Sequence, residues 1–255
     1  MESKISIILP VGPISNFLSR AIESIDNQNF NLKNIQLVII DDYKKNRNLL
    51  KNIKINNIKN IKYIHHHSNS VAHSRNIGVI NSEFNLISFL DADDEWLKNK
   101  IKQDLKYINR FNADLFYSNY NIIKKNKAKK RNSYQVQKKN LTKFVVNNPI
   151  GFSTITLKKK IFKELGLFKT YKVRSDHDFI LRFLNNNYKM KYIKNNIYLT
   201  NYYKVKNSLS SKKFLALLYF FKINLLYFGI FKGIFLTLNY VYFHLFKKNL
   251  KYKDE

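Results

Sequence analysis

FNLISFLDADDEW, residues Phe84–Trp96, joins an apolar run directly to a cluster of carboxylates. The apolar part, 86–90, is short and bounded by polar residues, which is typical of a buried strand in a parallel sheet. In an open α/β sheet, ligands bind beyond the carboxyl ends of the strands, and Asp91, Asp93 and Asp94 occupy that position here. An Asp-x-Asp pair there can share one divalent cation, because hard carboxylate oxygens suit Mg²⁺ or Mn²⁺. The segment alone is equally consistent with a solvated acidic turn that caps the following helix.

A second strand signal ends in acids in the same way. Ile35–Ile40 (IQLVII) is apolar and β-rich, and Asp41 and Asp42 follow it. An earlier run, Lys4–Val11 (KISIILPV), predicts the first strand, closed by the turn-forming Gly12-Pro13. Because parallel strands place their carboxyl ends at one edge of the sheet, two acidic strand ends indicate a ligand site more sharply than one.

The rest of the chain alternates strand and helix signals, which predicts an α/β fold: a Rossmann-like, mostly parallel sheet flanked by helices. Further strands are expected at 61–65, 113–119, 190–193 and 197–203, and helices at 15–27, 70–80, 97–111, 160–165 and 174–186. Between them, we expect a short exposed helix and loop at 46–60, a hairpin tip or mobile loop at 122–139, and a loop at 147–157.

Two of the predicted helix starts carry groups suited to chemistry. Arg75 lies near the start of the helix 70–80, and a helix N-terminus with an arginine is a ready anion site. Ser175 and Asp176 open the helix 174–186. The triplet 65–67 is all histidine, but adjacent residues on a strand point to opposite faces, so three in a row cannot bind one ion.

The composition bounds the class of protein. The chain has 255 residues, no cysteine and a formal net charge of +29. Disulfides and thiolate metal sites are therefore excluded, and a reducing compartment fits. The basic charge is spread along the chain without a helix-turn-helix, zinc-finger or aromatic single-strand signature, so no nucleic-acid partner is expected. The charge then indicates an anionic membrane surface, a phosphorylated substrate, or only compositional drift, since Lys, Asn and Ile dominate wherever a position is unconstrained. The first apolar run is too short for a secretory signal, and we expect none.

The C-terminal segment differs in character from the rest. Phe214–Phe246 is aromatic and aliphatic, interrupted by Lys222 and Lys232 and followed by a basic tail. None of its uninterrupted apolar runs reaches the roughly 18–20 residues that span a bilayer. It is either a pair of helices packed on the core or a membrane-surface anchor, and the flanking lysines favour the anchor. We therefore expect two units, 1–211 and 212–255, and a cytoplasmic protein held peripherally on the inner face of the cytoplasmic (inner) membrane.

Six stretches, in order, resemble the family 2 glycosyltransferases, which have the nucleotide-sugar-binding GT-A fold. They are ISIILPV, QLVIIDD, SRNIG, ISFLDADDEW, NPIGFST with GLF, and DHDFILRF with NSLS. The resemblance covers roughly residues 4–211 and rests on the order and spacing of the stretches. It implies an inverting, metal-dependent transfer of a sugar from a nucleotide-diphosphate donor, with a UDP-sugar as the first expectation, to a surface polysaccharide or lipid-linked glycan.

The resemblance also implies residue roles. Asp93 would be the direct ligand of a Mg²⁺ or Mn²⁺ ion held on the diphosphate, and Asp176 would take the proton from the attacking hydroxyl. Asp178 is an alternative base, although its place further into the helix favours a capping or pairing role. The implied nucleotide-binding residues are Pro10, Asp41, Asp42, Arg75 and Asp91.

The sequence departs from the family pattern at three places. Gly12-Pro13 replaces the usual Tyr-Asn, Tyr43-Lys44 replaces Gly-Ser, and Ser175 replaces a glutamate. The first two touch the expected nucleotide pocket, and the third removes a negative charge beside Asp176, which should make Asp176 less basic. These changes motivate an alternative function, a catalytically inactive sugar-nucleotide-binding or scaffolding subunit. The retained Asp93 and Asp176 argue against that alternative.

Overall fold

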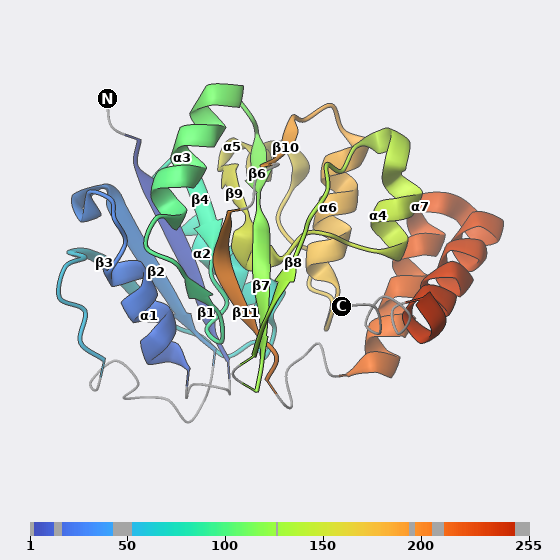
Figure 1. Cartoon of the computed structure of the whole chain (residues 1–255), viewed down its shortest axis with the longest axis horizontal. Helices are drawn as coiled ribbons and strands as arrows, with labels where there is room; N and C mark the ends of the chain where they lie inside the picture. The colour runs from blue at the N-terminus through green and yellow to red at the C-terminus, as the bar shows by residue number, and fades with distance from the viewer. Residues whose placement is uncertain are drawn as a thin grey trace.

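The computed structural model describes residues 3–12, 17–42, 53–125, 127–193, 197–205 and 212–247. Its centre is a seven-stranded sheet with the strand order β10-β6-β9-β4-β1-β2-β3 (Figure 1). The strands are β1 Ile5–Val11, β2 Ile35–Asp41, β3 Asn60–His65, β4 Leu86–Phe89, β6 Leu115–Tyr117, β9 Thr156–Lys158 and β10 Met190–Tyr192. Only the two pairings made by β9, with β4 and β6, are antiparallel. The mostly parallel sheet predicted from the sequence is confirmed.

The central strands of this sheet are covered on both faces, which explains their apolar runs, whereas the edge strand β3 is largely exposed. Every residue of β1 and β2 is buried. On one face, α1 (Leu18–Asp26) and α3 (Lys100–Phe111) pack against Ile7 and Ile39, while Ile8 and Ile40 point into the larger core on the other face. Side chains that alternate between two buried faces favour apolar residues at nearly every position. Two polar exceptions pair with each other: the Ser6 hydroxyl donates to the Gln36 side-chain oxygen at 2.7 Å.

The second face carries the helices that lead to the functional edge. They are α2 Val71–Ile80, α4 Leu141–Val146, α5 Lys160–Leu165 and α6 Ser175–Asn185. Gly78 brings α2 against β1, because a Cβ atom there would lie 2.3 Å from the Ile8 side chain. This contact places the start of α2 beside the carboxyl ends of β1 and β2 (Figure 1).

A smaller sheet lies beside the first, with the order β5-β11-β7-β8. Its strands are β5 Glu95–Trp96, β7 Asn119–Lys124, β8 Lys127–Arg131 and β11 Tyr198–Tyr203. The sequence predicted helix from residue 97, but α3 begins at Lys100, because Glu95 and Trp96 pair with β11. The predicted hairpin at 122–139 is present as β7 and β8.

Some sequence expectations concern residues that the structure does not describe. Of the short helix and loop expected at 46–60, residues 46–52 lie outside the described residues, and 53–59 are loop. Pro13, Tyr43, Lys44 and the NSLS stretch also lie outside them.

The C-terminal segment folds as a helical hairpin. α7 (Lys213–Tyr242) is broken at Gly229, whose φ of 74° and ψ of 177° are not helical, and it ends in a π-helical turn, Phe243–Lys247. The two arms touch: the Asn224 side chain donates to the Thr237 hydroxyl at 3.2 Å, and the Phe220 and Tyr240 ring centroids are 4.2 Å apart. By length and composition, Lys213–Phe246 is the one helix among the described residues that could cross a membrane, and only 17% of its most apolar window is buried.

Candidate active site

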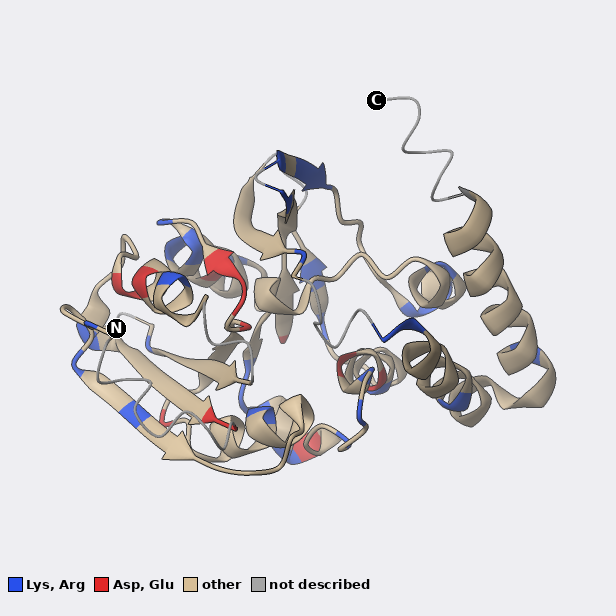
Figure 2. Cartoon of the chain, turned by 90° about the horizontal axis from the view of Figure 1, so that it is seen from below, with Lys and Arg blue, Asp and Glu red and all other residues tan. Residues whose placement is uncertain are grey.

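The functional side chains gather at the carboxyl edge of the large sheet. β1, β2 and β4 end there, and α2 and α6 begin there, at the bottom of Figure 1. α6 leads into β10, which runs parallel to β6, so the helix runs back along the sheet and its first turn must lie at this edge. Figure 2 views the chain from the same edge.

At the end of β2, both acids already have partners. The Asp41 carboxylate is fully buried and accepts a hydrogen bond from the Tyr63 hydroxyl at 2.6 Å, with His65 Nδ1 3.4 Å away. Asp42 accepts from the backbone N–H groups of 68–70 and from the hydroxyls of Ser68 and Ser74. Burial alone would raise the pKa of the Asp42 carboxyl, but these hydrogen bonds hold it below its ordinary value. Asp42 thus fixes the segment that enters α2.

Pro10 lies one residue before the end of β1, buried and opposite Ile40 of β2. Its neighbour Val11 accepts a hydrogen bond from the Asp42 backbone N–H at 2.9 Å, beyond the last ladder position. The end of β1 is therefore held in the same unit as the acids that follow β2.

At the end of β4, an arginine bridges two elements. Arg75 of α2 donates to the Asp91 carboxylate at 2.6 Å, and its guanidinium lies 4.1 Å from the centre of the Phe152 ring. Arg75 is buried, whereas 31% of the Asp91 side chain is exposed. The predicted anion-site arginine and the first acid of the Asp-x-Asp pair are thus brought together, with one face of the pair open to solvent.

The next two acids carry charge that the described residues do not fully compensate. Burial and the negative charge of Asp91 raise the pKa of Asp93 to about 6, and Arg20 and Arg75 only partly oppose them. Burial and the two neighbouring acids also raise the pKa of Asp94 well above its ordinary value, although the Ser153 hydroxyl donates to it at 2.5 Å. This crowding is the electrostatic signature of a position that a cation would stabilise.

The donor set fits a cation shared with a ligand. Among the described residues there is no group of three or more His, Asp or Glu that could hold a metal ion alone. Asp91 and Asp93 supply two carboxylates, and Mg²⁺ is commonly bound by one or two carboxylates with substrate phosphates and water completing the set. The histidine triplet is otherwise engaged: His65 and His67 approach each other at 3.1 Å between their Nε2 atoms, and His66 stacks on His73.

At the start of α6, Asp176 and Asp178 differ sharply. Asp178 is fully buried, with Arg182 Nε at 2.9 Å, Lys169 Nζ at 3.6 Å and the Tyr227 hydroxyl donating at 2.8 Å. Its predicted pairing role is confirmed. Asp176 is half-buried, and its side chain makes no hydrogen bond or ion pair with any described residue. Of the two acids, Asp176 is the one free to accept a proton.

Sequence reasoning missed some residues at this edge. Arg20 of α1 donates to the Asp93 backbone carbonyl at 2.6 Å and lies 3.5 Å from the centre of the Tyr203 ring. Ser153 contacts both Asp94 and the Asp91 backbone N–H. No spacing signal marks either residue, because these contacts join segments more than fifty residues apart in the chain.

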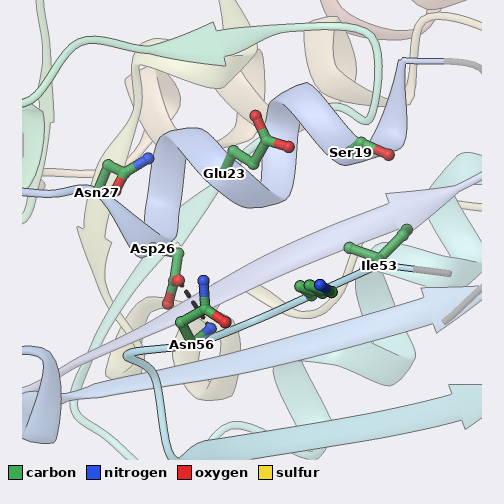
Figure 3. A pocket seen from close by; sticks show the side chains of 7 residues that line it. Ser19, Glu23, Asp26, Asn27, Ile53 and Asn56 are labelled. Carbon is green, nitrogen blue, oxygen red and sulfur yellow. Dashed lines mark hydrogen bonds between the residues drawn. The ribbon is translucent and has the colours of Figure 1, made fainter. Parts of the chain in front are cut away.

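A pocket of about 450 Å³ lies elsewhere, between α1 and residues 53–56 (Figure 3). Two acids, Glu23 and Asp26, line it, and Asp26 accepts hydrogen bonds from the backbone N–H groups of Asn56 and Asn57, at 2.9 and 3.0 Å. None of the predicted site residues lines it. The pocket is therefore not the candidate site.

The sheet order, the acidic strand ends and the helix before β10 define a protein of the GT-A fold class, and solved structures agree. Staphylococcus aureus TarS 1–349 in complex with UDP-GlcNAc superposes with a TM-score of 0.71 at 15% identity, covering 96% of this chain and 74% of TarS 1–349. The mannosyltransferase PcManGT from Pyrobaculum calidifontis, in complex with GDP-Man and Mn²⁺, gives a TM-score of 0.67 at 10% identity, covering 96% of this chain and 71% of that one.

The sequence narrows the class to one family. Residues 6–183 match Glycosyl transferase family 2, and the chain belongs to that family. The poly(ribitol-phosphate) beta-N-acetylglucosaminyltransferase TarP of Staphylococcus aureus is 29% identical over 240 residues, which cover 90% of this chain and 73% of TarP. The UDP-Glc:alpha-D-GlcNAc-diphosphoundecaprenol beta-1,3-glucosyltransferase WfgD of Escherichia coli is 25% identical over 210 residues, covering 82% and 81%.

Proposed function

We propose that the chain transfers a sugar from a nucleotide-diphosphate donor to an acceptor hydroxyl with inversion at the anomeric carbon, and that Asp176 is the general base. The observation that carries the proposal is the state of Asp176: it lies at the ligand edge of the sheet, half-buried and without a partner among the described residues. Asp176 takes the hydroxyl proton as that oxygen attacks the anomeric carbon, and the bond to the diphosphate breaks. One such displacement inverts the configuration.

The donor side of the proposal rests on Arg75, Asp91 and Asp93. Arg75 and the start of α2 offer positive charge to a diphosphate. Asp91 and Asp93 would hold Mg²⁺ or Mn²⁺, whose charge, when bound, offsets the charge that develops on the departing nucleotide. The structural neighbour PcManGT is in complex with GDP-Man and Mn²⁺, which supports a divalent cation alongside the donor.

The replacement at Ser175 does not support the alternative function, a catalytically inactive sugar-nucleotide-binding or scaffolding subunit. This serine is buried and donates to the Tyr171 backbone carbonyl at 3.1 Å, so it serves the structure of the turn while leaving Asp176 open. A scaffold would not need an unpaired carboxylate at this edge. We therefore favour an active enzyme.

For the donor and acceptor we propose a UDP-sugar and a surface polymer or lipid-linked glycan. TarS binds UDP-GlcNAc, and the names of TarP and WfgD give a ribitol-phosphate polymer and a diphosphoundecaprenol-linked sugar as acceptors. Both acceptor types carry phosphate, which suits a chain with a net charge of +29.

We also propose peripheral attachment to the cytoplasmic face of the inner membrane through the C-terminal hairpin. Its outer side forms an apolar surface in which each side chain is at least 60% exposed: Leu226, Ile230, Phe231, Phe235 and Leu238. Residues 212–247 include lysines but no acid, and the hairpin arms show no red in Figure 2. Apolar burial together with attraction to anionic lipid holds such a segment in the interface.

Liposome flotation tests the attachment. The chain should float with vesicles that contain anionic phospholipid, and high salt should release only part of it, because salt screens the charges but not the apolar contact. Phe231→Glu places a charge at the most exposed position of the apolar surface and should weaken flotation. Wild-type protein that stays at the bottom of the gradient would refute the attachment.

The base is tested by Asp176→Asn. Transfer, measured as UDP release from UDP-GlcNAc or UDP-Glc with Mn²⁺, should fall about 10²–10⁴-fold, while UDP affinity stays near wild type. Glu83→Gln removes the same charge at the opposite edge of the sheet, between the end of α2 and the start of β4, and should be silent. An Asp176→Asn variant that keeps most of its activity would contradict the proposed role.

A further inference from the structure

The first turn of α6 is held by residues of the C-terminal hairpin, which lies beside α6 and α4 (Figure 1). Tyr240 contacts Arg174, Phe220 contacts His177 and Tyr227 contacts Asp178. Asp176 lies between these contacts and makes none itself within the described part of the chain. The hairpin therefore fixes the residues on both sides of the proposed base while leaving the base free.

Arg174 is the most constrained of these residues. It is the N-cap of α6 and has a left-handed backbone, with φ 70° and ψ 14°. A non-glycine residue in this conformation costs of the order of 1 kcal/mol or more and persists only when its surroundings impose it. The Arg174 guanidinium donates to the Tyr240 hydroxyl at 2.6 Å and lies 5.4 Å from the ring centres of both Tyr240 and Phe220.

The backbone at Arg174 sets the direction in which α6 begins. Its carbonyl accepts the hydrogen bond from the Asp178 backbone N–H at 3.1 Å, and Asp176 lies within that turn. A change in the Arg174 dihedral angles would swing the Asp176 carboxylate relative to the strand ends. Misplacing a reacting group by about 1 Å can cost on the order of 10²-fold in rate.

We propose that Tyr240, acting through Arg174, is a positioning residue for Asp176, so that the C-terminal hairpin takes part in catalysis as well as in attachment. The proposal rests on the proposed function, since it assigns a task to the base named there. Tyr227 and Phe220 support the same turn from neighbouring positions. A purely structural contact would instead affect stability without a specific effect on turnover.

Tyr240→Phe is the test, because it keeps the ring and removes the hydroxyl bound to Arg174. Tyr242→Phe is the matched control: that side chain is 53% exposed and contacts Phe246, away from α6. With UDP-GlcNAc and Mn²⁺, Tyr240→Phe in the full chain should lower kcat about tenfold or more while KM for the donor stays within about twofold. Tyr242→Phe should match wild type in both.

Arg174→Gly separates the backbone from the side chain. Glycine can adopt the left-handed conformation without strain, so the fold should survive, but it is not held there, because the bond to Tyr240 is lost and glycine reaches other conformations equally readily. We expect the same fall in kcat as in Tyr240→Phe, and no further fall in the double variant, because both changes remove one interaction. Full kcat in Arg174→Gly, or additive losses in the double variant, would overturn the proposal.

Hydrogen exchange makes the test independent of turnover. The Asp178 amide, which donates to the Arg174 carbonyl, should exchange faster in Tyr240→Phe than in Tyr242→Phe, with the melting temperature unchanged. Equal exchange in the two variants would overturn the positioning role. A wild-type chain that releases no UDP from a panel of UDP-sugars would instead contradict the proposed function. Hydrogen exchange at the Asp178 amide would still show whether the contact between Tyr240 and Arg174 holds the first turn of α6.

Discussion

The ends of β2 and β4 look alike in sequence but differ in the structure. Each is an apolar strand that runs into a pair or cluster of aspartates at the same edge of the sheet. After β2, Asp42 accepts five hydrogen bonds from 68–70 and Ser74, and its pKa is lowered. After β4, Asp93 and Asp94 face their own like charges, and their pKa values are raised.

The difference shows that the role of an acid at a strand end depends on which other segment of the chain packs against it. Asp42 meets the backbone N–H groups of the segment that enters α2, so its charge is used to build the edge. Among the described residues, the charges that oppose Asp93 are those of Arg20 and Arg75, and Arg75 already pairs with Asp91. The acid after β2 therefore stabilises the structure of the edge, whereas the acids after β4 carry charge available to a ligand.

Asp93→Asn should produce the largest change. Because it removes a proposed metal ligand, transfer should fall on the order of 100-fold or more, and Mn²⁺ should no longer strengthen UDP binding in calorimetry. The free energy of unfolding of the metal-free chain should not fall, since an uncompensated charge is lost. Asp94→Asn, at the adjacent buried acid, is the control and should retain the metal effect. If wild type bound UDP equally well with Mn²⁺ and with chelator, the acids after β4 would not hold a metal, and the proposed difference between the ends of β2 and β4 would be wrong.

Asp42→Ala should show the reverse pattern. It leaves the backbone N–H groups of 68–70 without their acceptor, so the free energy of unfolding should fall by about 2–4 kcal/mol in urea titration. Asp42→Asn keeps one acceptor oxygen and should lose less. Any UDP binding that remains should still depend on Mn²⁺. A stable Asp42→Ala chain with weakened UDP binding would mean that Asp42 serves the ligand directly.

The two ends should also titrate with opposite signs in the metal-free chain. The lowered pKa of Asp42 gives stability that is present above the ordinary carboxyl pKa and lost as the pH falls through the folded value. The raised pKa of Asp93 gives stability that is complete below the ordinary value and lost as the pH rises through about 6.

Urea unfolding with chelator between pH 3 and 8 measures both signs. In Asp93→Asn, the fall in unfolding free energy as the pH rises through about 6 should shrink by about 1–2 kcal/mol, a figure that allows for the partial exposure of Asp93. In Asp42→Ala, the fall in unfolding free energy at acid pH should shrink instead. Identical pH profiles for the two variants would show that the ends are electrostatically equivalent.

The sequence predicted the parts of the fold that depend on local pattern. The apolar runs of β1, β2 and β4 predict these strands directly. The family resemblance assigned Arg75 to the nucleotide side, and the structure pairs Arg75 with Asp91. The first residue of a helix, in contrast, depends on tertiary contacts as well as on local pattern. Lys100 begins α3 because residues 95 and 96 join a strand from 198–203, and no local pattern reports such a partner.

Long-range contacts set the rest of the site. The bonds of Arg20 to the Asp93 carbonyl and of Arg174 to Tyr240 join residues 73 and 66 positions apart. Likewise, the apolar C-terminal pattern allowed either a core-packed helix pair or a surface anchor. The hairpin combines an inner side that packs on α6 with an outer side that stays exposed, a division that depends on the turn at Gly229.

The antiparallel strand β9 has a consequence for the order of folding. It is the only described strand that joins β6 and β10 to β4, and its Thr156 meets Ser88 from 68 residues away. β1 to β4 can pair as soon as residue 89 has left the ribosome, whereas β6 must wait, with its edges unpaired, until residue 158 has followed. Pulse-labelled hydrogen exchange should therefore find β1 and β2 protected before β6 and β10.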